Sequence, residues 1–176
     1  MTITFPTPCA ATAVPVARKL TVRLAESAED LLAAQHLRWR VFHLEMGASG
    51  ESILPSQRDC DPYDQLCDHL LVVDQSVAGM HEVVGTYRLL RESVARANTG
   101  FYSAGEFDIS LLERGPDRPV GELLELGRSC VLPQFRTSAT IQLLWRGIAD
   151  YIARHKIGLM FGCASFNGTD PEAHAE

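Results

Sequence analysis

The sequence lacks a long apolar run, a basic surplus and a regular cysteine pattern, and each absence excludes a class of protein. No window approaches the roughly 18 consecutive apolar residues that span a bilayer. The formal net charge is −6, which argues against a protein that coats nucleic acid. The five cysteines are odd in number and scattered, so we expect reduced thiols in a cytoplasm and no disulfide framework.

The N-terminus also lacks the pattern of a secretion signal. It begins without a cation, and Pro6, Pro8 and Pro15 interrupt its apolar stretch. We therefore expect residues 1–19 to form a disordered extension. Residues 20–176 are long enough to bury a core as one domain.

Apolar residues that alternate or run together predict strands at 19–27, 69–73, 82–91, 121–131 and 157–165. Three- and four-residue spacings predict helices from about 27 to 45 and from about 137 to 155. Residues 48–67 are predicted as loop, and 92–120 as a more polar connection. This order predicts an α/β (α+β) domain whose mixed, mostly antiparallel sheet is flanked by helices.

The two predicted helices carry different apolar faces. On the first helix, Arg38 shares a face with Leu31, Gln35 and Phe42, which places an arginine beside apolar side chains. The apolar face predicted for the second helix consists of Ile141, Leu144, Trp145, Ile148 and Ile152. The strand at 157–165 is apolar throughout, which is typical of a fully buried strand.

The stretch "RDCDPYDQLCDH" is rich in aspartate and allows three interpretations. Cysteine and histidine occur in it, but no pair has the Cys-x-x-Cys or His-x-x-x-His spacing of structural zinc, so we predict no metal. A solvated turn would also use aspartate. The third interpretation is a cation pocket, in which Asp61 and Asp64, supported by Asp59, lie beside Arg38.

Glu125 and Arg128 are candidate reactive residues on the predicted strand 121–131. In a regular strand, residues three apart point to opposite faces. Gly127 lies between them, and a glycine inside a strand often marks a bulge that redirects its neighbours. A bulge would bring both side chains to one side and expose a backbone N–H. An ion pair on the sheet surface is the alternative.

The remaining candidates also have plain structural interpretations. Arg88 either serves a binding site or is an ordinary surface cation. Phe42, Tyr87 and Trp145 either pack in the core or line a tunnel for an apolar chain.

Several motifs together resemble known acyltransferases with the GNAT fold. The segments "LRWRVF" (37–42), "DCDPYD" (59–64), "VVGTYRLL" (83–90) and "ELGRSCV" (125–131) resemble acyl-homoserine-lactone synthases that use acyl carrier protein. The resemblance to L-ornithine N-alpha-acyltransferases, which make lyso-ornithine lipid, is tighter. It adds "FYSAGEFD" (101–108), "LLWRGIADY" (143–151) and "FGCASFNGTDP" (161–171).

The resemblance implies a GNAT-like N-acyltransferase that moves a (3-hydroxy)fatty acyl group from acyl carrier protein to the α-amine of L-ornithine. It implies catalytic roles for Glu125 and Arg128 and donor binding by Arg136 and Ser138. The implied substrate-binding residues are Arg38, Phe42, Asp59, Asp61, Asp64 and Arg88. It implies a cytoplasmic enzyme in peripheral contact with the inner membrane, with no nucleic acid among its partners.

The implied donor and acceptor fit the residues. GNAT enzymes usually hold pyrophosphate with a Gly-rich turn, but "RTSATIQLL" (136–144) has Ser, Ala and Thr there, which favours carrier-borne phosphopantetheine over coenzyme A. We predict no other cofactor. Arg136, Arg146, Arg154 and Lys156 either meet the acidic surface of the carrier protein or form a solvated helix face.

The chemistry favours attack by the acceptor's α-amine. With a model α-amino pKa near 8, roughly a tenth of the amine is already neutral at pH 7, so a carboxylate such as Glu125 is base enough. A distal ammonium with a pKa near 10.4 is neutral about a few hundred times less often. The acidic loop would then hold the distal charge.

Two other functions stay open. One is an autoinducer synthase that acylates S-adenosylmethionine, and the other is a non-catalytic module that binds acyl carrier protein. The resembling families continue past "GTDP", so we expect a C-terminal part to be missing here. We then expect a poorly covered fifth strand, weak stability or self-association, and low activity unless a longer form exists.

Overall fold

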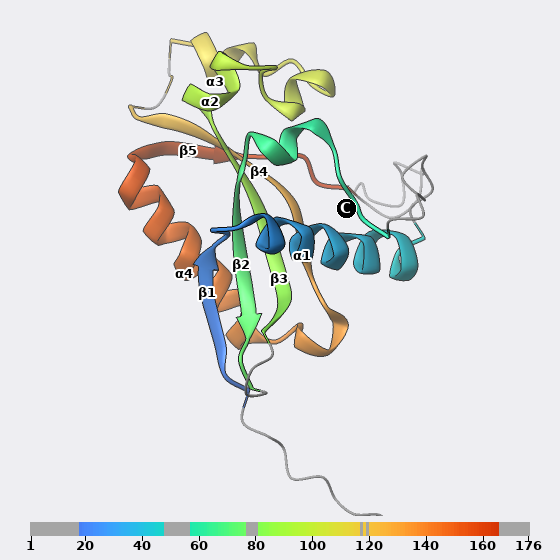
Figure 1. Cartoon of the computed structure of the whole chain (residues 1–176). Helices are drawn as coiled ribbons and strands as arrows, with labels where there is room; N and C mark the ends of the chain where they lie inside the picture. The colour runs from blue at the N-terminus through green and yellow to red at the C-terminus, as the bar shows by residue number, and fades with distance from the viewer. Residues whose placement is uncertain (1–17, 48–56, 77–80, 117, 119, 166–176) are drawn as a thin grey trace, which may run out of the picture.

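One mixed sheet forms the centre of the protein (Figure 1). The computed structural model describes residues 18–47, 57–76, 81–116, 118 and 120–165. The strands of this described part are β1 (Leu20–Leu24), β2 (Asp68–Asp74), β3 (Glu82–Arg91), β4 (Glu122–Val131) and β5 (Ile157–Phe161). They lie side by side in chain order, with antiparallel pairing from β1 to β4 and parallel pairing of β4 with β5. The predicted mixed, mostly antiparallel sheet is confirmed, whereas most of the predicted N-terminal extension lies outside the described residues.

Helix α1 (Ala28–Trp39) crosses one face of the sheet (Figure 1). The Ser27 hydroxyl caps it by accepting a hydrogen bond from the Asp30 N–H, as the sequence predicts. The helix does not stay α-helical to residue 45. From Arg40 to Glu45 it continues as a π-helix, η1, whose wider turn is frequent at functional sites.

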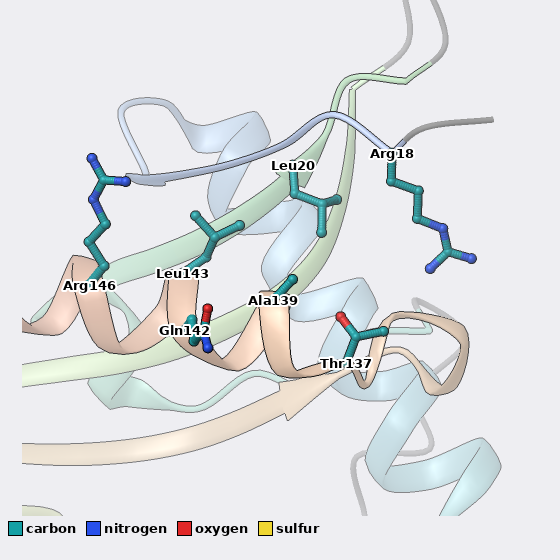
Figure 2. Close-up of a pocket in the computed structure, with 7 residues that line it drawn as sticks. All are labelled: Arg18, Leu20, Thr137, Ala139, Gln142, Leu143 and Arg146. Carbon is teal, nitrogen blue, oxygen red and sulfur yellow. The ribbon is translucent and has the colours of Figure 1, made fainter. Parts of the chain in front are cut away.

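Helix α4 (Ser138–His155) packs on the opposite face, and Thr137 caps it (Figure 1). A Cβ atom added at Gly147 would lie 2.8 Å from both Leu70 Cδ1 and Val22 Cγ2, so glycine allows the helix to approach β1 and β2 closely. The N-terminal half of α4 also borders a surface groove beside β1, which we call the β1–α4 groove (Figure 2).

The close approach at Gly147 rotates α4 away from the predicted face. The residues that it buries are Thr140, Leu144, Gly147, Ile148 and Tyr151. Of the predicted face, Leu144 and Ile148 are buried, but Ile141 and Trp145 are each 51% exposed. The prediction was wrong for these two because the helix packs through its glycine and not through its largest side chains.

Strand β5 is shorter and less buried than predicted. It ends at Phe161 instead of residue 165, and its side chains are half-buried or exposed. As the last strand in the sheet order, it has β4 as its strand neighbour within the described residues. The predicted fully buried position was therefore wrong.

The predicted polar connection 92–120 is folded, which the sequence pattern did not indicate. It contains α2 (Glu92–Ala97), the 3-10 turn η3 (Tyr102–Gly105) and α3 (Ser110–Arg114), gathered at one end of the sheet (Figure 1). A second apolar core lies there, formed by Leu90, Ala95, Phe101, Ile109 and Leu123. Because these apolar residues are spread among polar ones, no period of 2 or 3.6 reveals them.

Two further 3-10 turns complete the described elements, η2 (Pro62–Gln65) in the predicted loop and η4 (Pro133–Phe135) after β4. Among the described helices, none is long and apolar enough to cross a membrane.

Candidate active site

A cavity of about 1120 Å³ opens where β4 and β5 part. The two strands pair from Glu122 and Ile157 up to Glu125 and Phe161, and β4 then continues to Val131 without β5, still paired with β3. Residues from both sides of this divergence line the cavity, together with residues from η1, η3 and α4. The cavity therefore lies where the strand carrying Glu125 and Arg128 is open to a ligand.

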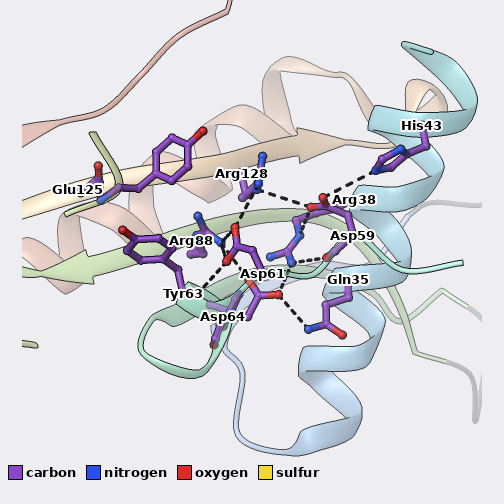
Figure 3. A network of polar contacts seen from close by, with 12 residues as sticks. Gln35, Arg38, His43, Asp59, Asp61, Tyr63, Asp64, Arg88, Glu125 and Arg128 are labelled. Atoms are coloured by element: carbon purple, nitrogen blue, oxygen red, sulfur yellow. Dashed lines mark hydrogen bonds and ion pairs between the residues drawn. The ribbon is translucent and has the colours of Figure 1, made fainter. Parts of the chain in front are cut away.

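A network of charged side chains stands beside the cavity (Figure 3). Three aspartates come from the segment around η2, and three arginines reach them from α1, β3 and β4. The members are Arg38, Asp59, Asp61, Asp64, Arg88 and Arg128. The structure thus brings together residues that the sequence placed in one site, and it pairs carboxylates with guanidinium groups.

Asp64 lies deepest in this network, with a side chain only 1% exposed. Its carboxylate accepts hydrogen bonds from Gln35 (2.9 Å), Arg38 (2.6 Å) and Arg88 (3.1 Å). Burial alone would raise the pKa of Asp64, but the hydrogen bond and charge of Arg38 outweigh it and hold that pKa below its usual value. The cation-binding role of Asp64 stays a prediction, and the geometry favours a structural role.

Asp61 is more accessible and links two arginines. Both of its oxygens accept from Arg88 Nη1, at 2.6 and 2.7 Å, and Arg128 Nη2 lies 3.1 Å away. Burial would raise the pKa of Asp61, but Arg88 outweighs it and lowers that pKa. Asp61 also caps η2 by accepting a hydrogen bond from the Tyr63 N–H.

Asp59 is the aspartate of the network that lines the cavity. Its Oδ2 lies 2.9 Å from Arg38 Nε, and its Oδ1 lies 3.8 Å from His43 Nε2. Arg38 itself is fully buried and donates a second contact to the Asp59 carbonyl oxygen, so it holds the loop onto α1. Figure 3 shows His43 reaching toward this end of the network from η1.

Glu125 lines the cavity, but both of its oxygens already have partners. They accept hydrogen bonds from the backbone N–H groups of Tyr102 (2.8 Å) and Ser103 (2.6 Å). The carboxylate therefore anchors the start of η3 at the cavity wall. A carboxylate has about four lone-pair positions, so Glu125 retains the capacity to accept a proton or a further hydrogen bond.

The expected bulge in β4 is present, one residue later than predicted. The β3–β4 register shifts between Thr86 and Arg88, and Arg128 has a φ of 49°, in the left-handed region. Such a conformation costs about 1–2 kcal/mol for a residue with a side chain. Contacts of Arg128 with Asp61 and Asp59 offset this cost, and both Arg128 and Glu125 face the same cavity.

Arg128 is the most accessible arginine of the network, with its side chain 33% exposed. Its guanidinium lies 6.0 Å from the ring centre of Tyr102, and that of Arg88 lies 5.5 Å from the ring of Tyr63. The two tyrosine rings meet edge to face at 5.8 Å. Arg88 is therefore a buried member of the site and not a surface cation.

Apolar side chains also line the cavity. Phe42, Tyr87 and Trp145 all line it, together with Met160 and Phe161 of β5. These aromatic residues are therefore wall residues of a cavity that can hold an apolar chain.

The predicted donor-binding residues differ in position. Arg136 lines the cavity and binds both carboxylate oxygens of Glu45, at 2.6 and 2.7 Å. Ser138 is the exposed first residue of α4. Their role in binding a donor stays a prediction.

Sequence reasoning missed the contributions of Tyr63, Tyr102, Ser103 and His43. The segment "FYSAGEFD" belongs to the resemblance, which could have drawn attention to Tyr102 and Ser103. Their contribution comes from backbone N–H groups, however, and every residue type except proline has one. Within the described residues no cluster of three or more side chains is suited to hold a metal ion. Burial raises the pKa of Cys67, in the acidic loop, to about 12.

Comparison with known proteins gives consistent matches. The model of the Acetyltransferase (GNAT) domain family matches residues 37–146. An L-ornithine N(alpha)-acyltransferase of Brucella abortus (strain 2308) is 52% identical over 159 residues, covering 89% of this chain and 56% of that relative. An L-ornithine N(alpha)-acyltransferase of Agrobacterium fabrum (strain C58 / ATCC 33970) is 51% identical over 160 residues, covering 89% of this chain and 54% of that relative.

The crystal structure of the AHL synthase LasI has a TM-score of 0.57 and 21% identity, and the match covers 83% of this chain and 72% of that one. At this identity the likeness concerns the fold. The chain spans about half the length of the curated relatives that it matches. Because the family model covers most of the sheet and the cavity, the chain belongs to the family of GNAT acetyltransferase domains.

Proposed function

We propose that this domain transfers a (3-hydroxy)fatty acyl group from acyl carrier protein to the α-amine of L-ornithine, which yields lyso-ornithine lipid. The observation that carries the proposal is the mixed lining of the cavity. Charged groups suited to an amino acid and apolar side chains suited to a fatty chain line the same cavity. The names of the relatives, which are half identical to the chain, favour ornithine as the amino acid.

Arg128 and Glu125 have separate roles in the proposed reaction. Arg128, whose side chain is 33% exposed and lines the cavity, binds the acceptor's carboxylate or the acyl oxygen. Glu125, on the same strand, takes the proton from the α-amine as it attacks the thioester carbonyl, directly or through one water. The carbonyl–sulfur bond breaks, and the phosphopantetheine thiol leaves with the carrier protein.

The acceptor's distal ammonium is held by the acidic loop. Asp59 lines the cavity and Asp61 is partly accessible, so these two are better placed than Asp64. Phe42, with Tyr87 and Trp145, borders the acyl chain. We place the reaction in the cytoplasm, where acyl carrier protein acts, with peripheral contact to the inner membrane that receives the product.

The proposal is tested by incubating the chain with acyl carrier protein carrying a fatty acyl group and with L-ornithine, followed by mass spectrometry. The expected product is N-α-acylornithine. S-adenosylmethionine in place of ornithine tests the autoinducer synthase. Lipids from cells that express the chain, with and without added ornithine, provide the second measurement. Absence of acylornithine in both would reject the proposal and leave a carrier-binding module.

A further inference from the structure

The charges of this acidic chain are unevenly distributed. No aspartate or glutamate occurs between Glu125 and Asp150, whereas Arg128, Arg136 and Arg146 all lie in that stretch. The stretch includes the first two-thirds of α4. The first turn of this helix contains no acidic residue. Acidic residues are usually favoured there because the helix dipole is positive at this end. Arg128 and Arg136 are paired with Asp61 and Glu45, so the local basic surface at the N-terminal half of α4 consists of Arg146 together with Arg18 beside it, on a chain with a net charge of −6.

The β1–α4 groove lies on this basic surface. It has a volume of about 490 Å³ and shares no lining residue with the cavity. Its lining residues are Arg18, Leu20, Thr137, Ala139, Gln142, Leu143 and Arg146. Figure 2 shows the two arginines at opposite ends, with Leu20, Ala139 and Leu143 between them. The groove is an apolar trough with a cation at each end.

Both arginines are available to an external partner. Arg18 is exposed and held in place, because its guanidinium lies 4.2 Å from the ring centre of Phe135 and donates to the Gln134 carbonyl oxygen. Arg146 is exposed on α4. In the described part of the chain, neither arginine forms an ion pair with a carboxylate. No carboxylate of the described residues therefore compensates their charges.

We propose that the β1–α4 groove docks an acidic amphipathic helix of the acyl carrier protein that brings the acyl group. The inference rests on the proposed function. An amphipathic helix binds a groove through its apolar face, and acidic residues at its two ends would meet Arg18 and Arg146. The net negative charge of the chain repels an acidic partner from other surfaces, so this basic surface also orients the encounter.

The position of the groove agrees with delivery into the cavity. Helix α4 lies between them, with Gln142 and Arg146 on the groove side and Trp145 on the cavity side. Arg136, which lines the cavity, directly precedes Thr137, which lines the groove, so a carrier protein in the groove would be next to the cavity at the start of α4.

The test compares two acyl donors that share one thioester, acyl carrier protein and acyl-pantetheine. Arg18→Glu and Arg146→Glu, alone and combined, are measured beside Arg114→Glu, which makes the same change at an exposed position of α3, outside the groove and the cavity. For the double variant we expect the KM for acyl carrier protein to rise at least about tenfold. The kcat/KM for acyl-pantetheine should change less than about twofold, and Arg114→Glu should match the wild type.

Three results would overturn the inference. These are an unchanged KM for acyl carrier protein in the double variant, an equal effect of Arg114→Glu, or an equal loss with acyl-pantetheine. Direct titration of unacylated carrier protein against the same variants tests binding in the groove independently of turnover. Binding should weaken as the salt concentration rises. A chain that binds the carrier through the groove but turns over neither donor would reject only the proposed function.

Discussion

At the scale of single residues, the site depends on a buried set of charges that balance one another. Arg38, Arg88 and Arg128 face Asp59, Asp61 and Asp64, so three positive charges meet three negative ones. Burying paired charges contributes little net stability because desolvation offsets attraction. The network instead fixes the positions of α1, the η2 loop, β3 and β4 around the cavity.

Removal of the Asp64 charge should destabilise the fold. Asp64→Asn leaves Arg38 and Arg88 buried with fewer carboxylate contacts, and breaking such a pair costs about 3–5 kcal/mol. We expect a loss of about 3 kcal/mol in the free energy of unfolding, measured by urea denaturation. Glu82→Gln, which breaks the exposed ion pair with Arg40, is the matched control and should lose less than about 1 kcal/mol. Equal losses in the free energy of unfolding would show that the buried network contributes no more to stability than an exposed ion pair.

Glu125 should act on the rate and not on substrate binding. Glu125→Gln keeps an oxygen for one of the two backbone N–H groups but cannot take a proton. We expect kcat to fall by about 10²–10⁴ with little change in either KM, and the acidic limb of the pH–rate profile to disappear. A variant with kcat within about threefold of wild type and a lower Tm would instead assign Glu125 a purely anchoring role.

At the scale of elements, irregular backbone gathers at the cavity. The π-turn η1 supplies Phe42 and His43, and the bulge of β4 presents Arg128. The 3-10 turn η3 directs two N–H groups at Glu125. Bulges and π-turns lose regular hydrogen bonds, and proteins keep them where they direct a side chain or expose a polar group.

Close packing of α4 should depend on Gly147. A leucine there would drive its side chain into Leu70 and Val22, since even a Cβ atom would lie 2.8 Å from each. We expect Gly147→Leu to lower the free energy of unfolding by about 1–3 kcal/mol, despite the better helix propensity of leucine. Ala149→Leu, on the exposed side of the same helix, should stay within about 0.5 kcal/mol. Similar values for both would mean that α4 shifts freely on the sheet.

At the scale of the whole molecule, two apolar cores enclose one charged site. The main core lies between the sheet and its helices, and the second core lies under α2, η3 and α3. Charged groups of Asp59, Arg88, Glu125 and Arg128 line the cavity, together with apolar side chains from β5, η1 and α4. A ligand with a charged head and a long apolar chain fits this mixed lining.

Stability should fall in two steps as the pH decreases. Burial lowers the pKa of His69, so its stabilising effect is complete above about pH 6.5 and is lost as the pH falls toward the folded-state pKa. Asp61 and Asp64 also have lowered pKa values, so their contribution is present above about pH 4 and is lost below it. Urea midpoints measured from neutral to acidic pH should show both steps. In Asp61→Asn the lower step should be shallower, and parallel curves would contradict this.

The sequence predicted the sheet well where apolar periodicity is strong. Strand β3 has the predicted limits, and α4 ends where its pattern ends. The prediction failed at 92–120 and at β5, because short helices have little periodicity and an apolar strand can lie at an edge. The sequence pattern also did not predict the rotation of α4. This rotation depends on the close approach of Gly147 to Leu70 Cδ1 and Val22 Cγ2 on the neighbouring strands.

By itself, the sequence determined the order of elements and the pairing of Glu125 with Arg128 across a bulge, whereas the grouping of the acidic loop with Arg38 was implied by the resemblance to known acyltransferases. The first two are local properties, set by side-chain period, turn residues and a glycine within a strand. Only the tertiary structure decided which charges neutralise one another, that two backbone N–H groups hold Glu125, and that β4 and β5 part to form a cavity. These features depend on distances between segments far apart in the chain, because hydrogen bonds and ion pairs act over a few ångströms of space and not over positions in sequence.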